Sequence, residues 1–385
     1  MTLKNLRLTG LIALAAFIIS SCQKPSLGLS VHDGRFSHEG RPLRAVGVNY
    51  YDLFTRLAAK PQDTSSLQGL KTLAALGVPF VRFNAGGYSG KDWERYRADP
   101  EVHFATMDKV VREAERLGIG LIPSVFWHST LNEAVGERRQ SWGDPASETL
   151  AQMRDYTQRL VSRYQDSPAI WAWEFGNEWN LKMDLPNAAQ LRKPGQDERD
   201  DLTSEQVLLA LREFSAGVRN IDPSRPLITG HSHPRAAAWH NTHEKSWKPD
   251  TREQWREIML RDNAGGYDTL GIHIYADKEV NAECGRWATG WMDFLAALRE
   301  VADETQRPIF IGEFGLGDGG EHTPEEVRRR FKEVMDAMEQ NGIDLAAVWV
   351  YDLKNQTGNW NITPDNERAY MLQDVIEANR RWSKK

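Results

Sequence analysis

Short apolar segments alternate with amphipathic segments along most of this 385-residue chain, and this alternation limits the folds open to it. The apolar segments have the length and continuity of buried parallel strands, and the others have helical periodicity. We expect strands at 43–48, 80–84, 120–126, 170–175, 227–230, 269–275, 309–313 and 346–351. We expect helices at 67–76, 106–117, 148–164, 204–220, 252–260, 289–305, 324–340 and 368–382. The repeat predicts a parallel sheet covered by helices.

The number of repeats favours closure of this sheet into a (β/α)8 TIM barrel, with an open doubly wound sheet as the alternative. The connections from each helix to the next strand are short. Four connections from strand to helix are long, at 127–147, 176–203, 231–251 and 352–367. In a (β/α)8 barrel such loops surround the C-terminal ends of the strands, where active sites lie. We therefore expect the functional site at that end.

The N-terminus has the pattern of an export signal. Lys4 and Arg7 precede an apolar run at 11–19 that is too short to span a bilayer comfortably. The run ends in Ser20-Ser21-Cys22, which resembles the lipobox of bacterial lipoproteins; an ordinary signal peptide with an incidental cysteine is the alternative. We expect export and membrane anchoring in a bacterial envelope through a lipid on Cys22.

Three regions follow from this interpretation. Residues 1–21 form the signal peptide, 22–30 a tether and 31–385 one catalytic domain. Within the domain, Asp33-Gly34 is a tight-turn signal between extended segments, so a small N-terminal β-hairpin should precede the first barrel strand.

Composition narrows the class of partner. A formal net charge of -6 argues against nucleic acid, which favours a basic surface. The 14 tryptophans suit carbohydrate, because indole rings stack on the flat faces of sugars, although many tryptophans are simply core. Several occupy the long loops, where we favour sugar-binding positions over core: Trp127, Trp142, Trp179, Trp239 and Trp360. We expect a monomer.

Two glutamates end predicted strands on the same side of the barrel. Glu178 in W-E-F-G-N-E-W-N follows the fourth strand, and Glu313 in P-I-F-I-G-E-F-G ends the seventh. A single buried glutamate is commonly neutralised by an arginine, but two that converge on one mouth indicate chemistry. Retaining glycosidases use such a pair, with the carboxyl groups ~5 to 5.5 Å apart.

From about Val31 onward, the sequence resembles glycoside hydrolase family 5, whose members are retaining (β/α)8 enzymes of β-linked polysaccharides. Six further positions match the family's catalytic centre in chain order: Arg82, His128, Asn177, His273, Tyr275 and Trp349. The resemblance implies that Arg82 and Tyr275 support a nucleophile at Glu313. It also implies that Asn177 binds the sugar 2-hydroxyl and that Trp349 lies under the sugar. Most members have proline where this chain has Trp179, which leaves β-glucan and β-mannan both open as substrates.

This arrangement predicts a division of labour between the two glutamates. Glu313 should be held ionised as the nucleophile, and Glu178, facing that charge, should keep its proton as the acid/base. A catalytically silent glycan-binding lipoprotein and a transglycosylase are the alternatives. We expect no cofactor.

Other polar residues carry weaker signals. His231, His233, His240 and His243 raise the question of a metal site, but they lack acidic partners at ligand spacing, and we expect no metal. Glu174 is interpreted as a structural residue of the barrel interior. For Asp352, contact with substrate and capping of a loop are both open.

Overall fold

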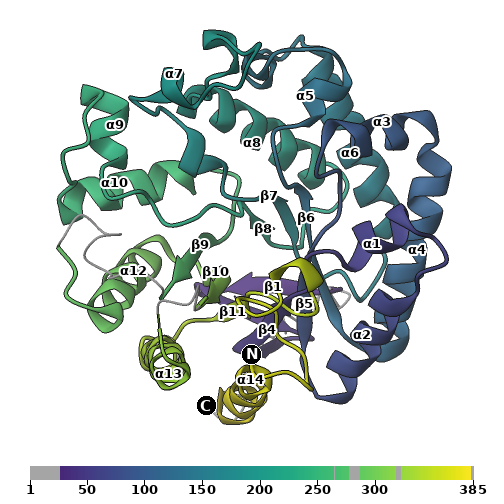
Figure 1. The fold of residues 1–385 in the computed structure, drawn as a ribbon, viewed down its shortest axis with the longest axis vertical. Coiled ribbons are helices and arrows are strands. Elements are labelled where there is room, and N and C mark those ends of the chain that lie inside the picture. The colour runs from purple at the N-terminus through teal and green to yellow at the C-terminus, as the bar shows by residue number, and fades with distance from the viewer. Residues whose placement is uncertain (1–26, 264, 277–286, 318–321, 383–385) are drawn as a thin grey trace, which may run out of the picture.

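The computed structural model describes residues 27–263, 265–276, 287–317 and 322–382. The predicted signal peptide and Cys22 lie outside the described residues. Eight strands form a parallel sheet at the centre of a ring of helices (Figure 1). They are β4 (Ala45–Asn49), β5 (Phe80–Asn84), β6 (Gly120–Phe126), β7 (Trp173–Gly176), β8 (Leu227–Ile228), β9 (Leu270–Tyr275), β10 (Ile309–Gly315) and β11 (Leu345–Val348).

The pairing order of these strands identifies a barrel. From β4 to β8 and from β9 to β11, each strand pairs with its neighbour in sequence, and the first strand, β4, also pairs with the last, β11, as closure requires. Within the described residues, β8 and β9 are not paired as strands, and two hydrogen bonds of flanking residues join the two sides: Thr269 Oγ1 donates to Leu227 O (3.0 Å), and His233 N donates to His273 O (3.2 Å). The predicted (β/α)8 fold is confirmed, and the open doubly wound alternative is wrong.

Eight long helices cover the strands near their predicted positions. They are α2 (Ser65–Ala75), α4 (Pro100–Leu117), α6 (Glu148–Tyr164), α8 (Ser204–Arg219), α10 (Arg252–Asp262), α12 (Trp291–Thr305), α13 (Pro324–Gln340) and α14 (Ala369–Trp382). Thr203 and Thr323 form capping boxes at the starts of α8 and α13. The left-handed Gly118 ends α4, which a residue with a Cβ would do only with strain. These local signals made the starts of α8 and α13 and the end of α4 predictable, whereas α4 begins at Pro100, before its predicted start at residue 106.

In the described residues, the connections from strand to helix contain short elements that the sequence pattern did not predict. Five are helical: α1 (Leu53–Ala59), α3 (Gly90–Ala98), α5 (Leu131–Ala134), α7 (Ala188–Leu191) and α9 (Ala238–Glu244). Four are single 3-10 turns: η1 (Arg139–Gly143), η2 (Trp179–Lys182), η3 (Glu198–Asp200) and η4 (Lys354–Gln356). Elements this short depend on tertiary contacts and leave little periodicity in the sequence.

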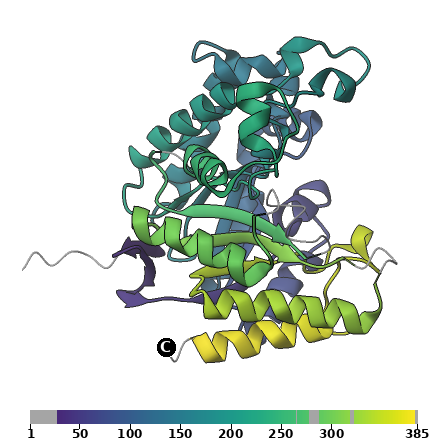
Figure 2. The same cartoon turned by 90° about the vertical axis from the view of Figure 1, so that its left-hand side faces the viewer.

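A small antiparallel sheet precedes the barrel, formed by β1 (Leu29–His32), β2 (Arg35–His38) and β3 (Arg41–Pro42). Asp33 and Gly34 both have positive φ, as a tight hairpin turn requires, so the predicted hairpin is confirmed with one added strand. Leu29 N donates to Trp171 O (3.0 Å), which places this sheet at the N-terminal end of the barrel (Figure 2). The opposite end is left to the long loops.

The helices of the described residues include none that is both long and apolar enough to cross a membrane.

Candidate active site

The polar side chains predicted to carry chemistry meet at the C-terminal ends of the strands. They surround a cavity of about 380 Å³. Its lining consists of Tyr51, Tyr88, Trp127, His128, Asn177, Glu178, Tyr275, Glu313, Trp349, Leu353, Asn355 and Gln356. Arg82 and His273 lie beneath this lining, each in contact with one of the two glutamates. The structure therefore brings together all eight residues that the sequence analysis selected for the barrel mouth.

Glu313 lies on β10 with both carboxylate oxygens occupied. Arg82 Nη1 donates to Oε1 (2.8 Å), and the Tyr275 hydroxyl donates to Oε2. Burial raises the pKa of Glu313, while the charge of Arg82 and the Tyr275 hydrogen bond act in the opposite direction. Protonation of either oxygen would displace a donor, so the contacts favour the charged form.

Glu178 is the second residue after the end of β7, and its side chain faces Glu313. Its backbone is left-handed (φ 53°), and its N–H donates to Gly230 O at the end of β8 (2.8 Å). His273 Nδ1 lies 3.1 Å from Glu178 Oε1 and 3.6 Å from Glu313 Oε2. Burial raises the pKa of Glu178, which favours a protonated carboxyl group. Burial also lowers the pKa of His273 to about 4, so this imidazole is neutral.

The separation of the two glutamates agrees with a retaining geometry. A carboxylate oxygen of Glu178 and one of Glu313 lie within 4.8 Å of each other. Inverting enzymes need a gap of ~6.5 to 9.5 Å to hold a water molecule between the carboxyl groups, and retaining enzymes need ~5 to 5.5 Å. The pair is placed for direct attack by one carboxylate and proton transfer by the other.

Arg82 is the centre of a buried polar network beneath the glutamates. Its guanidinium donates to Asn49 Oδ1 (2.9 Å), Asn177 Oδ1 (2.8 Å) and Glu174. Glu174 is fully buried in the barrel interior, as predicted. The sequence analysis did not select Asn49. Asn49 is the last residue of β4, and Arg82 lies near the end of β5. A polar residue that ends an apolar run was the feature of the sequence that could have identified Asn49.

Aromatic rings form one wall of the cavity. Trp349 lies beside Trp127 (ring centroids 6.2 Å apart) and Tyr51 (6.1 Å), and its Nε1 donates to Gln356 Oε1 (3.0 Å). Tyr88 packs on His128 with centroids 4.7 Å apart. Tyr51 and Tyr88 were missed in the sequence, although both follow strand ends. Such a wall can stack on sugar rings.

Two of the loop tryptophans are core residues, which corrects the sequence prediction. Trp142 and Trp179 are buried and pack edge to face at 4.7 Å, and Trp179 Nε1 donates to Phe126 O (2.9 Å). Burying an indole removes a large apolar area from water, and here the ring anchors the loop after β7. Trp179 thus anchors the backbone directly after Glu178.

The other three loop tryptophans differ from one another. Trp127 is buried yet lines the cavity, as predicted for a sugar-binding position. Trp360 packs edge to face on Tyr275 (5.1 Å). Trp239 donates to Glu257 (2.9 Å) and does not line the cavity.

The remaining candidates were Asp352, His231, His233, His240 and His243. Asp352 accepts hydrogen bonds from Tyr50 (3.1 Å) and Arg56 (2.7 Å), so it ties the loop after β11 to the start of α1. The four histidines do not gather three metal-ligand atoms at one point within the described part of the chain. His240 Nδ1 is instead bonded to Asp250 (2.7 Å).

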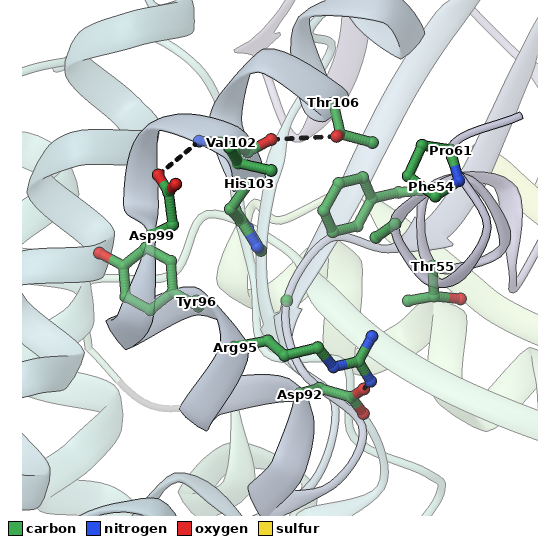
Figure 3. A pocket seen from close by; sticks show the side chains of 12 residues that line it. Phe54, Thr55, Pro61, Asp92, Arg95, Tyr96, Asp99, Val102, His103 and Thr106 are labelled. Carbon is green, nitrogen blue, oxygen red and sulfur yellow. Dashed lines mark hydrogen bonds and ion pairs between the residues drawn. The ribbon is translucent and has the colours of Figure 1, made fainter.

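A second cavity, of about 210 Å³, lies between α1, α3 and α4 (Figure 3). Phe54, Tyr96 and His103 line it, and the ion pair of Asp92 with Arg95 lies at its edge. Its wall is mainly apolar and includes neither of the facing glutamates. The strand-end cavity is therefore the candidate active site.

Comparison with known proteins agrees with this geometry. The family model described as Cellulase (glycosyl hydrolase family 5) matches residues 43–355. A putative mannan endo-1,4-beta-mannosidase 9 of Oryza sativa is 24% identical over 315 residues, which are 73% of this chain and 69% of the relative. A mannan endo-1,4-beta-mannosidase A of Podospora anserina is 39% identical over 166 residues, 38% of this chain and 44% of the relative.

Solved structures show the same fold. The endo-1,4-beta-mannanase of Rhizomucor miehei superposes with a TM-score of 0.63 at 14% identity, covering 93% of this chain and 100% of the other. An endo-beta-1,4-mannanase of Thermotoga petrophila has a TM-score of 0.61 at 16% identity, covering 89% of this chain and 77% of the other.

Proposed function

The chain belongs to glycosyl hydrolase family 5, and from this premise we propose that Glu313 is its nucleophile, Glu178 its acid/base and β-1,4-linked mannan its substrate. Family membership makes the protein a retaining hydrolase of β-linked polysaccharide of the glucan or mannan type. The observation that carries the assignment of roles is the unequal hydrogen bonding of the two glutamates. Arg82 and Tyr275 both donate to Glu313, whereas the hydrogen-bond partners of the Glu178 carboxyl group are the neutral side chains of His273 and Ser232.

In the first step, Glu313 attacks the anomeric carbon while Glu178 protonates the leaving oxygen. The bond from sugar to aglycone breaks as the bond from sugar to Glu313 forms. Asn177 Oδ1 already accepts from Arg82, so its Nδ2 is left to donate to the 2-hydroxyl, a contact that strengthens in the transition state. Trp349 supports the ring from the aromatic wall.

In the second step, Glu178 acts as a base toward water. Esterification of Glu313 removes its negative charge, so the pKa of Glu178 falls and its proton departs with the leaving group. Water then attacks from the side of Glu178 and releases the sugar with its original configuration.

Mannan is proposed because the curated relatives reported above are named as mannan endo-1,4-beta-mannosidases. The catalytically silent alternative is disfavoured by the intact pair of glutamates and the donors on Glu313. Transglycosylation would use the same residues as hydrolysis. The two activities are distinguished by measuring how much product carries the sugar on an acceptor sugar instead of on water.

The test is digestion of mannan, glucomannan, β-glucan and xylan by the purified domain, with product sizing and NMR of the anomeric configuration. We expect cleavage of mannan with retention. A 2-fluoro mannoside should label a peptide that contains Glu313. Cleavage of β-glucan alone would reject the substrate, and inversion or a label elsewhere would reject the mechanism.

We also propose that the protein is exported and held on a bacterial membrane by a lipid on Cys22. The proposal rests on the basic residues, apolar run and Ser-Cys junction of the N-terminal segment. Attachment of two or more acyl chains would make the anchoring stable. Cys22→Ser should release the protein from the membrane fraction or leave it unprocessed. Unchanged partitioning, with no labelled fatty acid on the wild type, would contradict the anchor.

A further inference from the structure

The buried Glu174 binds the same arginine that binds Glu313. Arg82 Nε donates to both of its oxygens (2.8 and 3.0 Å), and Arg82 Nη2 lies 2.6 Å from Oε1. Neither side chain is exposed to solvent. Glu174 thus binds one edge of the guanidinium in a two-pronged contact, the geometry in which arginine is most firmly oriented.

The remaining N–H groups of Arg82 all point toward the catalytic residues or their support. Nη1 donates to Asn49 Oδ1 and to Glu313 Oε1, and Nη2 donates to Asn177 Oδ1. A guanidinium has only five N–H donors in a rigid plane, so fixing one edge fixes the direction of the others. The position of Glu174 therefore determines where Arg82 presents its donors to Glu313 and Asn177.

The surrounding backbone leaves room for this carboxylate. Gly230 has a positive φ, and a Cβ there would lie 2.8 Å from Glu174 Oε1 and 1.8 Å from Gly176 O. A side chain at position 230 would push against the glutamate and the strand that carries it. The segment that follows β8 thus passes too close to Glu174 to carry a side chain at position 230.

Charge gives the contact a second consequence. Arg82 is a single cation between two buried carboxylates, Glu174 and Glu313. If Glu174 were neutral, the whole charge of Arg82 would act on Glu313, lowering its pKa and making it a weaker nucleophile. Glu174 shares that charge, so Glu313 is oriented by Arg82 without being fully neutralised by it.

We propose that Glu174 is a positioning residue of the catalytic centre, which orients Arg82 and through it sets both the direction and the reactivity of Glu313. The inference rests on the proposed role of Glu313. It assigns no contact between Glu174 and substrate.

The test is Glu174→Gln in the full chain, which keeps the shape and removes the charge. The first measurement is kcat/KM as a function of pH, with an aryl β-glycoside that the wild type hydrolyses. The second is the rate at which the matching 2-fluoro glycoside inactivates the enzyme. We expect kcat/KM to fall by roughly 10²-fold, because the nucleophile and Asn177 lose their fixed direction. The acid limb, which reports ionisation of the nucleophile, should move to lower pH.

The charged or titratable groups facing Glu313 are Arg82 from β5, Glu178 from the loop after β7, and His273 and Tyr275 from β9. All four remain in the variant, so a moved acid limb is attributable to position 174. Glu174→Asp keeps the charge and shortens the reach. Its kcat/KM should fall while its acid limb stays at the wild-type pH.

The matched control is Asp222→Asn. Asp222 and Arg225 form another buried ion pair (2.6 Å), away from the cavity. This variant should lower the melting temperature and leave the pH profile of kcat/KM unchanged. Wild-type kcat/KM and acid limb in Glu174→Gln, with or without a lower melting temperature, would overturn the proposal.

A second variant keeps the proposal testable if Glu174→Gln does not fold. In that case a wild-type inactivation rate in Glu174→Asp would overturn it. Failure of the proposed function appears differently, as a wild type that is inactive on every glycoside or labelled at a residue other than Glu313.

Discussion

The two ends of the barrel are built from the same strands but from opposite kinds of side chain. At the N-terminal end, Phe80 of β5 and Phe310 of β10 pack with Leu29, Phe36 and Trp171 in an apolar cluster. Further along the same strands, Arg82 follows Phe80 by two residues on β5, and Glu313 follows Phe310 by three residues on β10. The change from apolar to charged side chains within a few residues separates the part of each strand that packs in the barrel from the part that faces the candidate active site.

This contrast has a physical cause. The sheet of β1 to β3 covers the N-terminal end and excludes water from it, so apolar side chains there gain free energy on burial. The opposite end opens into the cavity, where charged groups persist because each has a partner or faces the substrate space. Substitutions at the two ends should therefore affect different measurements.

The largest effect is expected at the polar end. Glu313→Gln removes the nucleophile while keeping the fold, so kcat should fall by at least ~10⁴-fold. Steady-state kinetics and a thermal melt measure the two quantities separately. A wild-type rate in this variant would reject both the nucleophile and the assignment of chemistry to this end.

Glu178→Ala should cost ~10² to 10⁴ in kcat/KM on substrates with poor leaving groups, since proton transfer is lost. Activated aryl glycosides need little proton assistance, so their glycosylation should persist while deglycosylation slows. Because the acid works in its protonated form and burial raises the pKa of Glu178, wild-type kcat/KM should fall as pH rises through that pKa. The variant should lack this basic limb; an unchanged limb would assign it to another group.

Phe310→Ala tests the apolar end. Phe310 is fully buried, and its truncation should lower the free energy of unfolding by about 3 to 5 kcal/mol. At a temperature where the variant is folded, kcat and KM should stay near the wild-type values. Denaturant unfolding and kinetics on the same sample provide the comparison. A large fall in kcat without loss of stability would mean that the two ends are not functionally separate.

The smallest effect is expected at the aromatic wall. Trp349→Ala should remove stacking on the sugar worth ~1 kcal/mol or more, and so lower kcat/KM about tenfold while the melting temperature changes little. Trp142→Ala is the matched comparison, because that tryptophan is core and should lower stability instead. If both variants reduce stability equally and leave activity unchanged, Trp349 also belongs to the core.

Much of the fold was determined by local sequence. α6 and α13 begin and end at the predicted residues, because apolar periodicity, capping residues and terminal glycines act over a few positions along the chain. The Asp33-Gly34 turn was equally local. The placement of Glu178 and Glu313 at strand ends followed from strand order alone, since parallel strands in a barrel direct their C-terminal ends to one mouth.

Tertiary structure decided what each loop side chain does. Trp142 and Trp179 were expected at the sugar but are buried, because a residue outside a regular element has no period from which its direction can be read. Tyr51 and Tyr88 line the cavity from loops, and the sequence analysis missed them because the direction of a loop side chain is not set by a regular period. The sharing of Arg82 between Glu174 and Glu313 joins residues 92 and 231 positions away along the chain, and only the closed barrel brings them within hydrogen-bonding distance.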